Sequence, residues 1–531
     1  MKKNIFLLLL LGVTHLFAQF NNLKVSSDSA YFPEEVTIAI NPVNPNQVAA
    51  GANIYYFYSF EQLSNSWKEK ILTSGFGVWG DPCVVYDTKG NLFFAHLSNP
   101  PSGYWIDRIV IQKSTDNGLT WSDGVGVGFN SPKNQDKEWL AVDHSNSRYR
   151  NNIYVAWTEF DKYASNNSKD SSRILFSYSE DEGETWSTPV RISDVGGNCL
   201  DKDETVEGVV PAIGVNGEIY LTWAGPKGLM FDKSLDGGKT FGKDIFITDI
   251  PGGWDFDVPG IDRCNGMPIT ACDISKSDYR GNIYVGWSDQ RNGKDNTDIF
   301  FIKSIDNGKT WSAVKKVNND NSSRHQFFTW MTVDSTSGNI YFIFYDRRNT
   351  TGNATDVYIA RSKDGGETFQ NFKISQSSFV PDKNVFFGDY INIAVYKGVI
   401  RPIWMRMDDG DLSIWSAEIT DKMLDAVDVN YGELCTHAHN FYLAPNYPNP
   451  FNPTTAIEFS LPENAYVKLG VFNLLGEQVA VLNNSEMNKG NYTRTWNAEN
   501  LSSGIYLVKI NITGLVTGNN YSKVRKAVLI K

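Results

Sequence analysis

The stretch Ser114-Thr115-Asp116-Asn117-Gly118-Leu119-Thr120-Trp121 decides the fold, because its pattern Ser-x-Asp-x-Gly-x-Thr-Trp/Phe occurs five times in the chain. The copies are about 60 residues apart. The other four begin at Ser179, Ser234, Ser304 and Ser362, and a worn copy spans 59–67. Regular spacing of this kind indicates a repeat architecture in which each copy marks one structural unit.

Each octad has the chemistry of a tight hairpin turn. A glycine stands where the turn needs a positive φ. The aspartate and hydroxyl side chains can bond the N–H groups of the turn, and the final Trp or Phe can pack under the hairpin. We therefore predict a structural role, not a catalytic one, for the octad aspartates, which are Asp116, Asp181, Asp236, Asp306 and Asp364.

The segments before each octad have the composition of β-strands. One strand leads directly into the octad, as at Ile109–Ile111, and it follows a segment related to Asn-Ile-Tyr-Val-Ala-Trp at 152–157. A short apolar strand lies further upstream, as at Cys83–Asp87, and no segment has a useful helical period. Units of four antiparallel strands, repeated in this way, predict the blades of an all-β propeller.

The number of blades follows from the first strands. The seventh unit has no fourth strand of its own, and Leu23–Ser27 at the other end of the propeller could supply it and close the ring. The sequence thus favours seven blades, with six as the alternative. The seven first strands begin near Thr37, Cys83, Glu138, Val209, Pro268, Thr329 and Asp389.

The C-terminal part of the chain has a different pattern. After Thr420 the repeats lapse, and residues 421–440 have the character of a linker. Residues 441–531 open with Tyr-Pro-Asn-Pro-Phe-Asn-Pro at 447–453, and a Ser-Gly-Ile-Tyr element follows at 503–506. Several short alternating strands predict a small β-sandwich here.

Composition and the N-terminus limit the location and the partners. The 49 basic and 60 acidic residues give a net charge of −11 without a basic stripe, which argues against a nucleic-acid surface. Residues 1–18 have the charged head, apolar centre and small-residue end of a secretory signal peptide. No later segment reaches about 18 uninterrupted apolar residues. We expect an exported chain that is not integral to a membrane.

The cysteines and histidines offer little chemistry. Five cysteines are too few for a disulfide scaffold, and an odd count leaves one thiol over. Cys199 and Cys264 could form a disulfide bridge, whereas we predict that Cys83 and Cys272 are small core residues. The sequence Cys-Thr-His-Ala-His at 435–439 has three close metal-ligand types but no distant partners. We therefore predict no metal site there.

Two resemblances carry expectations about fold and export. The octad resembles the Asp-box, or BNR repeat, and residues 20–420 resemble the sialidase-like propellers, which include glycoside hydrolases and non-catalytic binders. Residues 441–531 resemble the type A C-terminal sorting domain of the type IX secretion system of Bacteroidetes and their relatives. The second resemblance implies translocation across the outer membrane and a secreted or cell-surface protein that contacts the secretion machinery.

The strand directions and the first resemblance together suggest a ligand face. The loops between second and third strands and those between blades share one face, opposite to the octads. Arg291, Arg348 and Arg406 follow the second strands of consecutive blades, and their guanidinium forks suit a carboxylate. Sialidases clamp their substrate's carboxylate with three arginines. Asp289 and Asp346 stand two residues before two of these arginines and could instead pair with them.

Catalytic residues are less well marked. A sialidase needs a tyrosine nucleophile, a glutamate and an acid/base aspartate. Tyr390 is a candidate nucleophile, Asp289 and Asp346 are weak candidates, and no partner glutamate stands out. No arginine occurs before Arg108, which departs from the arginine motif that sialidases carry in the first blade.

Other residues on the same face suggest binding. Clustered carboxylates could chelate calcium or form an acid/base pair, and Trp254 could stack on a sugar ring. The charged residues are Asp81, Glu138, Glu159, Asp161, Glu207, Asp255, Asp257 and Asp389.

Three functions remain open from the sequence. The first is an exported propeller that binds a glycan or a protein ligand without demonstrated chemistry. The alternative is an exo-sialidase-like glycoside hydrolase that acts on acidic glycans. A propeller that only displays its loops is a third. Convergence of the three arginines on one point would favour the hydrolase, and capping of each by its own aspartate would favour binding.

Overall fold

The computed structural model describes residues 20–62, 64–427, 441–444, 446, 448–516, 518 and 520–531. The signal-peptide segment, Tyr447 and the Cys-Thr-His-Ala-His segment lie outside these residues. The chain divides into two compact units, one ending at Lys422 and the other beginning at Met423, and each is described by itself.

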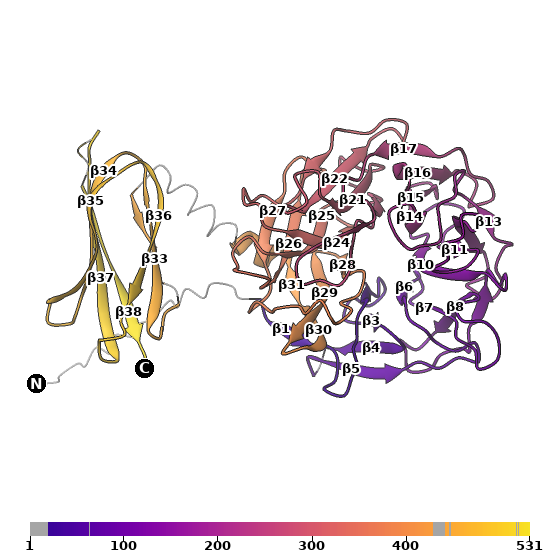
Figure 1. The fold of residues 1–531 in the computed structure, drawn as a ribbon, viewed down its shortest axis with the longest axis horizontal. Coiled ribbons are helices and arrows are strands. Elements are labelled where there is room, and N and C mark those ends of the chain that lie inside the picture. The colour runs from indigo at the N-terminus through magenta and orange to yellow at the C-terminus, as the bar shows by residue number, and fades with distance from the viewer. Residues whose placement is uncertain are drawn as a thin grey trace, which may run out of the picture. The chain divides into compact units, whose positions relative to one another are not determined.

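The first unit is a ring of seven antiparallel sheets, shown in Figure 1; six have four strands, and the seventh has a fifth strand added to its four. The first strands are β2 (Thr37–Ile40), β6 (Cys83–Tyr86), β10 (Asn134–Val142), β14 (Glu207–Ile213), β20 (Ile269–Cys272), β24 (Gln326–Val333) and β28 (Asn392–Tyr396). The second strands are β3 (Val48–Ala52), β7 (Leu92–Leu97), β11 (Ile153–Phe160), β15 (Ile219–Gly225), β21 (Ile283–Asp289), β25 (Ile340–Asp346) and β29 (Val399–Asp408).

The outer half of each sheet contains the third and fourth strands. The third strands are β4 (Tyr56–Glu61), β8 (Ile109–Ser114), β12 (Ser172–Ser179), β16 (Gly228–Ser234), β22 (Asp298–Ser304), β26 (Asp356–Ser362) and β30 (Asp411–Ala417). The fourth strands are β5 (Ser66–Ile71), β9 (Val125–Val127), β13 (Val190–Arg191), β17 (Ile245–Thr248), β23 (Lys315–Lys316), β27 (Gln370–Lys373) and β1 (Asn22–Lys24). A small hairpin of β18 (Asp255–Phe256) and β19 (Cys264–Asn265) precedes the fifth blade.

The first strands surround the ring axis. Each contacts the first strand of the next blade all the way round, and β28 contacts β2. The strand β1 pairs with β30, with Leu23 opposite Ser416, so the N-terminal segment completes the seventh blade. Both the propeller and the favoured count of seven blades are therefore confirmed.

The octads fix the turns between third and fourth strands. In the copy that begins at Ser114, the Ser114 hydroxyl donates to Asp116 at 2.8 Å and accepts from the N–H of Gly118 at 2.8 Å. The Thr120 N–H and hydroxyl both donate to the Asp116 carboxylate, at 2.8 and 2.5 Å. Matching bonds recur around Asp181, Asp236, Asp306 and Asp364.

The octads also connect neighbouring blades. Trp121 packs against Phe57 of the preceding blade, with ring centroids 5.0 Å apart. Gly118 has a φ of +86°, and a Cβ there would lie 2.2 Å from the Phe57 ring. Gly238, Gly308 and Gly366 approach an aromatic ring of the preceding blade in the same way. Glycine is thus required at this position by the turn and by the neighbouring blade.

The segment after the propeller differs from the expected linker. Residues 421–427 are helical, after a short strand β31 (Ile419–Thr420) that pairs with β29. The Asp421 carboxylate accepts bonds from Tyr341 and Arg361, and Leu424 is buried. The Asp421 contacts bind the start of this segment to the sixth blade. The remainder, 428–440, lies outside the described residues.

The second unit is a sandwich of two antiparallel sheets. One contains β32 (Tyr442–Leu443), β33 (Thr454–Leu461) and β36 (Gly490–Asn497). The other has the order β35 (Gln478–Met487), β34 (Ala465–Phe472), β37 (Gly504–Gly514) and β38 (Asn520–Leu529). Alternate residues of the strands, such as Val467, Leu469 and Val471 of β34, form one apolar core.

Cys83, Cys199, Cys264 and Cys272 are all free thiols. The suggested bridge between Cys199 and Cys264 is therefore absent, and both residues are buried in their own loops. Among the described residues, no helix is long and apolar enough to span a membrane.

Candidate functional site

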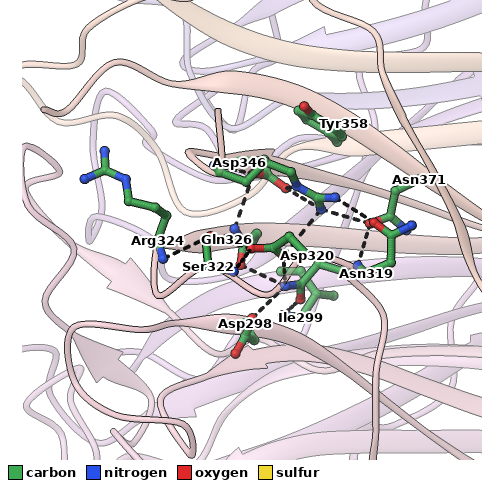
Figure 2. A network of polar contacts seen from close by, with 12 residues as sticks. Asp298, Ile299, Asn319, Asp320, Ser322, Arg324, Gln326, Asp346, Tyr358 and Asn371 are labelled. Carbon is green, nitrogen blue, oxygen red and sulfur yellow. Dashed lines mark hydrogen bonds and ion pairs between the residues drawn. The ribbon is translucent and has the colours of Figure 1, made fainter. Parts of the chain in front are cut away.

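The three candidate arginines are each held by a nearby aspartate, and Arg406 lies within β29, not after it as expected. Figure 2 shows the surroundings of Asp346, whose carboxylate accepts from the Arg348 Nε at 2.8 Å and from the Arg348 backbone N–H at 2.7 Å. The remaining Arg348 nitrogens donate to Asn319 and Asn371, at 2.7 and 2.9 Å. Arg348 thus joins the loop before β24 to the outer strand β27 of its own blade.

Arg291 and Arg406 are engaged in the same manner. Arg291 Nε lies 2.9 Å from Asp289, whose carboxylate also accepts from the indole of Trp287. Arg406 Nε donates to Asp408 at 2.6 Å, and its Nη1 donates to Ser377. No hydrogen bond or ion pair joins the three guanidinium groups to a common partner, and each one covers an aromatic ring of its own blade. The structure therefore does not bring them together.

Other predicted residues lie apart from the ring axis. Trp254 is buried, and its ring fills the space above Gly208, so it offers no stacking face. Glu159 and Asp161 belong to an ion-pair group with Lys133 and Arg173. This group lines a surface pocket of about 710 Å³ on the third blade.

A second group of polar side chains meets at the axis, where the first strands begin. We call this group the axial cluster; its members are Glu35, Asn53, Asp81, Asp136, Lys137, Glu138, Asp201, Glu207, Arg263 and Asp389. The backbone is irregular there: φ is positive at Glu35, Asp81, Lys137 and Asp201. The pairing of β10 with β11 shifts between Asp136 and Trp139, and a similar shift occurs in β14. A bulge redirects the side chains of a strand. The irregular backbone at the beginning of these strands therefore directs charged side chains toward one another.

Hydrogen bonds connect this axial cluster across six blades. Lys137 Nζ donates to Asp389 at 2.5 Å, and Arg263 Nε donates to the same carboxylate at 3.0 Å. Arg263 also donates to Asp201. The Lys137 N–H donates to Asp81 at 3.1 Å. Asn53 links Asp81 to Glu35. Residues from six blades can meet only near the ring axis.

The two cations of the axial cluster are neutralised inside it. Burial acts to raise the pKa of Asp389, but the charges of Arg263 and Lys137 outweigh it and hold the pKa below its usual value. The same balance lowers the pKa of Asp201. Two carboxylates thus stand against two cations. An additional anion would find no unpaired positive charge among these residues.

Four further carboxyl groups of the axial cluster favour the neutral form. Burial, followed by the charge of Asp81, raises the pKa values of Glu35 and Glu138 well above the usual range. Burial also raises the pKa of Asp136, and burial followed by the charge of Asp201 raises that of Glu207. Glu138 is 1% exposed, and neither of its carboxyl oxygens has a hydrogen-bond partner among the described residues. A neutral acid costs less to bury than an anion.

This assignment makes a prediction for Glu138→Gln. In the wild type, the unfolded chain loses the Glu138 proton above about pH 4.5, whereas the folded chain keeps it, so stability falls as the pH rises toward the folded-state pKa. Glutamine stays neutral throughout. The variant should therefore be more stable than the wild type at pH 8, and the difference should shrink at pH 4.5. Urea unfolding at both pH values tests this; a variant that is less stable by the same amount at both would contradict it.

Aromatic rings fill the axis beside the cluster. Trp139 of β10 and Trp330 of β24 face each other with ring centroids 4.2 Å apart, and Tyr390 packs edge-on to Trp139 at 5.5 Å. The Tyr390 hydroxyl lies 3.5 Å from Asp81. Burial, followed by the charges of Asp81 and Glu35, raises the pKa of Tyr390. A nucleophile needs the opposite shift.

An exposed row of aromatic side chains leads from the loops to the axial cluster. Trp79 lies in the loop before β6, and Trp105 lies between β7 and β8; their ring centroids are 6.1 Å apart. Trp105 packs edge-on to Tyr163 at 5.6 Å, and the Tyr163 hydroxyl donates to Asp201 at 2.7 Å. Trp79 and Trp105 are 38% and 39% exposed. We call Trp79, Trp105 and Tyr163 the aromatic row.

Sequence reasoning found part of this arrangement. Asp81, Glu138, Glu207, Asp389 and Tyr390 had been assigned to this face; the axial cluster contains the four acidic residues, and Tyr390 lies beside it. It missed the two cations Lys137 and Arg263, and it missed the aromatic row. A usable signal existed for Lys137, which stands within Asp-Lys-Glu directly before the apolar part of a first strand. In the described part of the chain, no group of three or more His, Cys, Asp or Glu side chains is placed to hold a metal ion.

The comparisons with known proteins decide the identity of the C-terminal unit. Residues 446–528 match the family model described as the secretion system C-terminal sorting domain. The C-terminal sandwich is a type IX sorting domain. The sorting domain makes this a secreted or cell-surface protein, and it implies contact with the type IX machinery. No curated protein matches the chain.

The solved structures similar to this chain are distant in sequence. A Trypanosoma rangeli sialidase is 12% identical, with 88% of this chain and 87% of that chain covered and a TM-score of 0.40. NanB sialidase from Streptococcus pneumoniae is 9% identical, with 76% and 94% covered and a TM-score of 0.42. A Dyadobacter fermentans protein of unknown function is 12% identical, with 64% and 96% covered and a TM-score of 0.41. The propeller architecture is shown by the seven sheets themselves.

Proposed function

We propose that the exported propeller binds a carbohydrate on the face formed by its inter-blade loops and its second-to-third-strand loops, without hydrolysing it. The observation that carries this proposal is the aromatic row, in which two partly exposed indoles connect through Tyr163 to the charged axis. An indole offers a flat apolar surface to the C–H face of a sugar ring, and nearby polar groups can bond its hydroxyls. Tyr104, next to Trp105, is exposed and extends the same surface.

The charges of the site favour a neutral sugar. Arg263 is the partly exposed cation of the axial cluster, and its guanidinium is already bound by Asp389 and Asp201. Arg291, Arg348 and Arg406 are bound by their own aspartates. A sugar carboxylate would have to displace one of these partners, and at every arginine except Arg406, whose partner Asp408 is half exposed, this would leave a buried carboxylate unpaired. We therefore propose a ligand built from uncharged pyranoses.

Hydrolysis remains a second candidate because Tyr390 lies beside Asp81, Glu35 and Glu138. This places a tyrosine, an aspartate and two glutamates together, as the sialidase-like reading requires. The raised pKa of Tyr390 argues against an active nucleophile. The arginines are already paired with aspartates, which argues against an acidic substrate. Binding is therefore the better-supported function.

The test of binding is a panel of immobilised neutral and sialylated oligosaccharides, with affinities measured by calorimetry for any ligand found. The double variant Trp79→Ala/Trp105→Ala should bind at least about tenfold more weakly than the wild type, because it removes both stacking surfaces. Phe246→Ala, which removes an exposed ring from the outer strand β17, is the matched control and should bind normally. Binding that survives in the double variant, or that is confined to sialylated glycans, would refute the proposal.

The same preparation tests hydrolysis with fluorogenic glycosides, including sialosides. We expect no cleavage by the folded wild type. Cleavage that disappears in Tyr390→Phe and in the triple variant Arg291→Ala/Arg348→Ala/Arg406→Ala would instead establish the hydrolase with its carboxylate clamp.

A further inference from the structure

The sorting domain exposes two adjacent leucines at the end of one hairpin. Leu474 and Leu475 connect β34 to β35 and are 67% and 85% exposed. Two neighbouring large apolar side chains in water are costly to solvate and mark a contact surface when they occur together. The described core of the sandwich does not include them.

The turn that carries the leucines is rigidly built. The Asn473 side-chain oxygen accepts from the N–H groups of Leu475 and Glu477, both at 3.0 Å. The Asn473 N–H donates to the Glu477 carbonyl at 3.0 Å, and the Gly476 N–H donates to the Asn473 carbonyl at 3.1 Å. Gly476 has the positive φ that this turn needs. Both leucines are thus held outward before any partner arrives, which lowers the entropic cost of docking.

The surface beside the turn is apolar and mainly basic, and the exposed Glu477 is the acidic residue of the turn itself. Phe472 pairs with Leu507, and Leu507 pairs with Lys526, so the turn lies at the end of the sheet where the chain terminates. Ile505 and Ile530, at the same end, are also exposed. The outward-facing residues of the next rows include three exposed lysines and no acidic residue. These lysines are Lys468, Lys509 and Lys526.

We propose that the Leu474–Leu475 turn is the contact through which the sorting domain docks into a component of the secretion machinery. The partner that fits has an apolar pocket for the two leucines and an acidic surface opposite the lysines, because charge complementarity orients such an encounter. The proposal rests on the sorting domain and is independent of the carbohydrate proposal. It is carried by the exposed pair, the rigid turn and the three lysines on the adjacent face.

The same sheet provides a matched control at its other end. Leu515 and Val516 form a second exposed apolar pair in the turn between β37 and β38. Their backbone N–H groups bond Asn464 and Glu463, so an acidic side chain lies beside this pair. The two turns can therefore be compared within one domain, because each presents two exposed apolar side chains.

The experiment expresses the full chain in a bacterium that has the type IX system and measures the fraction that reaches the medium or the cell surface. Leu474→Asp/Leu475→Asp should lower the exported fraction at least about tenfold, with the protein retained in the periplasm. Leu515→Asp/Val516→Asp should export within about twofold of the wild type. Leu474→Met/Leu475→Met, which keeps both side chains apolar, should also export normally.

Folding is measured separately on each purified full-length variant by its unfolding midpoint. Exposed substitutions of this kind shift stability little, so all midpoints should agree with the wild type. Normal export of the Leu474→Asp/Leu475→Asp variant would overturn the proposal. Equal retention of both aspartate variants, or retention of the methionine variant, would also overturn it, because the requirement would then not be an apolar contact at this turn.

Discussion

Asp389→Asn is expected to destabilise the propeller by about 3–5 kcal/mol, the usual cost of removing one partner from a buried ion pair. Asp389 accepts from both Lys137 and Arg263, and Lys137 is buried with it. Without the carboxylate, the two cations would face each other in a site of low polarity. The large effect follows from the charge left behind more than from the bond lost.

Urea unfolding followed by tryptophan fluorescence measures this loss, because Trp496 is the one tryptophan of the sequence beyond residue 422. Asp408→Asn is the control: Asp408 is half exposed, and its pair with Arg406 should contribute less than about 1 kcal/mol. Adding Lys137→Met to Asp389→Asn should recover part of the loss, since it removes one of the unpaired charges. Similar midpoints for Asp389→Asn and Asp408→Asn would show that the axial cluster does not stabilise the ring as described.

A chain that begins at Ser27 should lose about 3–6 kcal/mol of propeller stability relative to one that begins at Gln19. It lacks β1 and the buried side chains of Phe20 and Val25, each of which contributes about 1.5–3 kcal/mol by burial. It also leaves β30 without its neighbour, including the bond from the Val25 N–H to Ile414.

Adding the missing strand back as a peptide tests this prediction directly. A synthetic peptide of residues 19–27, added to the shortened chain, should raise the unfolding midpoint in proportion to the logarithm of its concentration above its Kd. A scrambled peptide of the same composition should have no effect. An unchanged midpoint in the shortened chain would mean that the seventh blade is stable as three strands.

The propeller could be predicted because its signals are local. The octad encodes a turn through residues that bond one another within eight positions, so five copies and their spacing were enough to indicate blades. The replacement of the missing strand by Leu23–Ser27 followed from counting strands. Local chemistry of this kind does not depend on which blades are neighbours.

The candidate site depended on contacts that the sequence does not reveal. The sequence correctly placed Arg348 after a second strand. It did not reveal that Asn319 and Asn371, which come from other segments, hold the guanidinium beside Asp346 and away from the other two arginines. Lys137 points to the axis because of a bulge, and a bulge breaks the alternation on which strand patterns rely. Trp79 and Trp105 lie in irregular loops, where no period exists to mark their exposure.

The octad glycines have a consequence for how such a ring acquires its size. Each of four octad glycines packs against an aromatic side chain of the preceding blade; they are Gly118, Gly238, Gly308 and Gly366. This contact is head-to-tail, so it could in principle be repeated through any number of blades. An internal blade could be duplicated with every octad still matched. The series ends only at the junction of the seventh and first blades, where Arg401 covers Phe60 and β1 crosses from the N-terminus. The octad contacts therefore do not set the number of blades. A ring of another size would need new residues at this seam and at the axis, where Trp139 meets Trp330 and Lys137 meets Asp389.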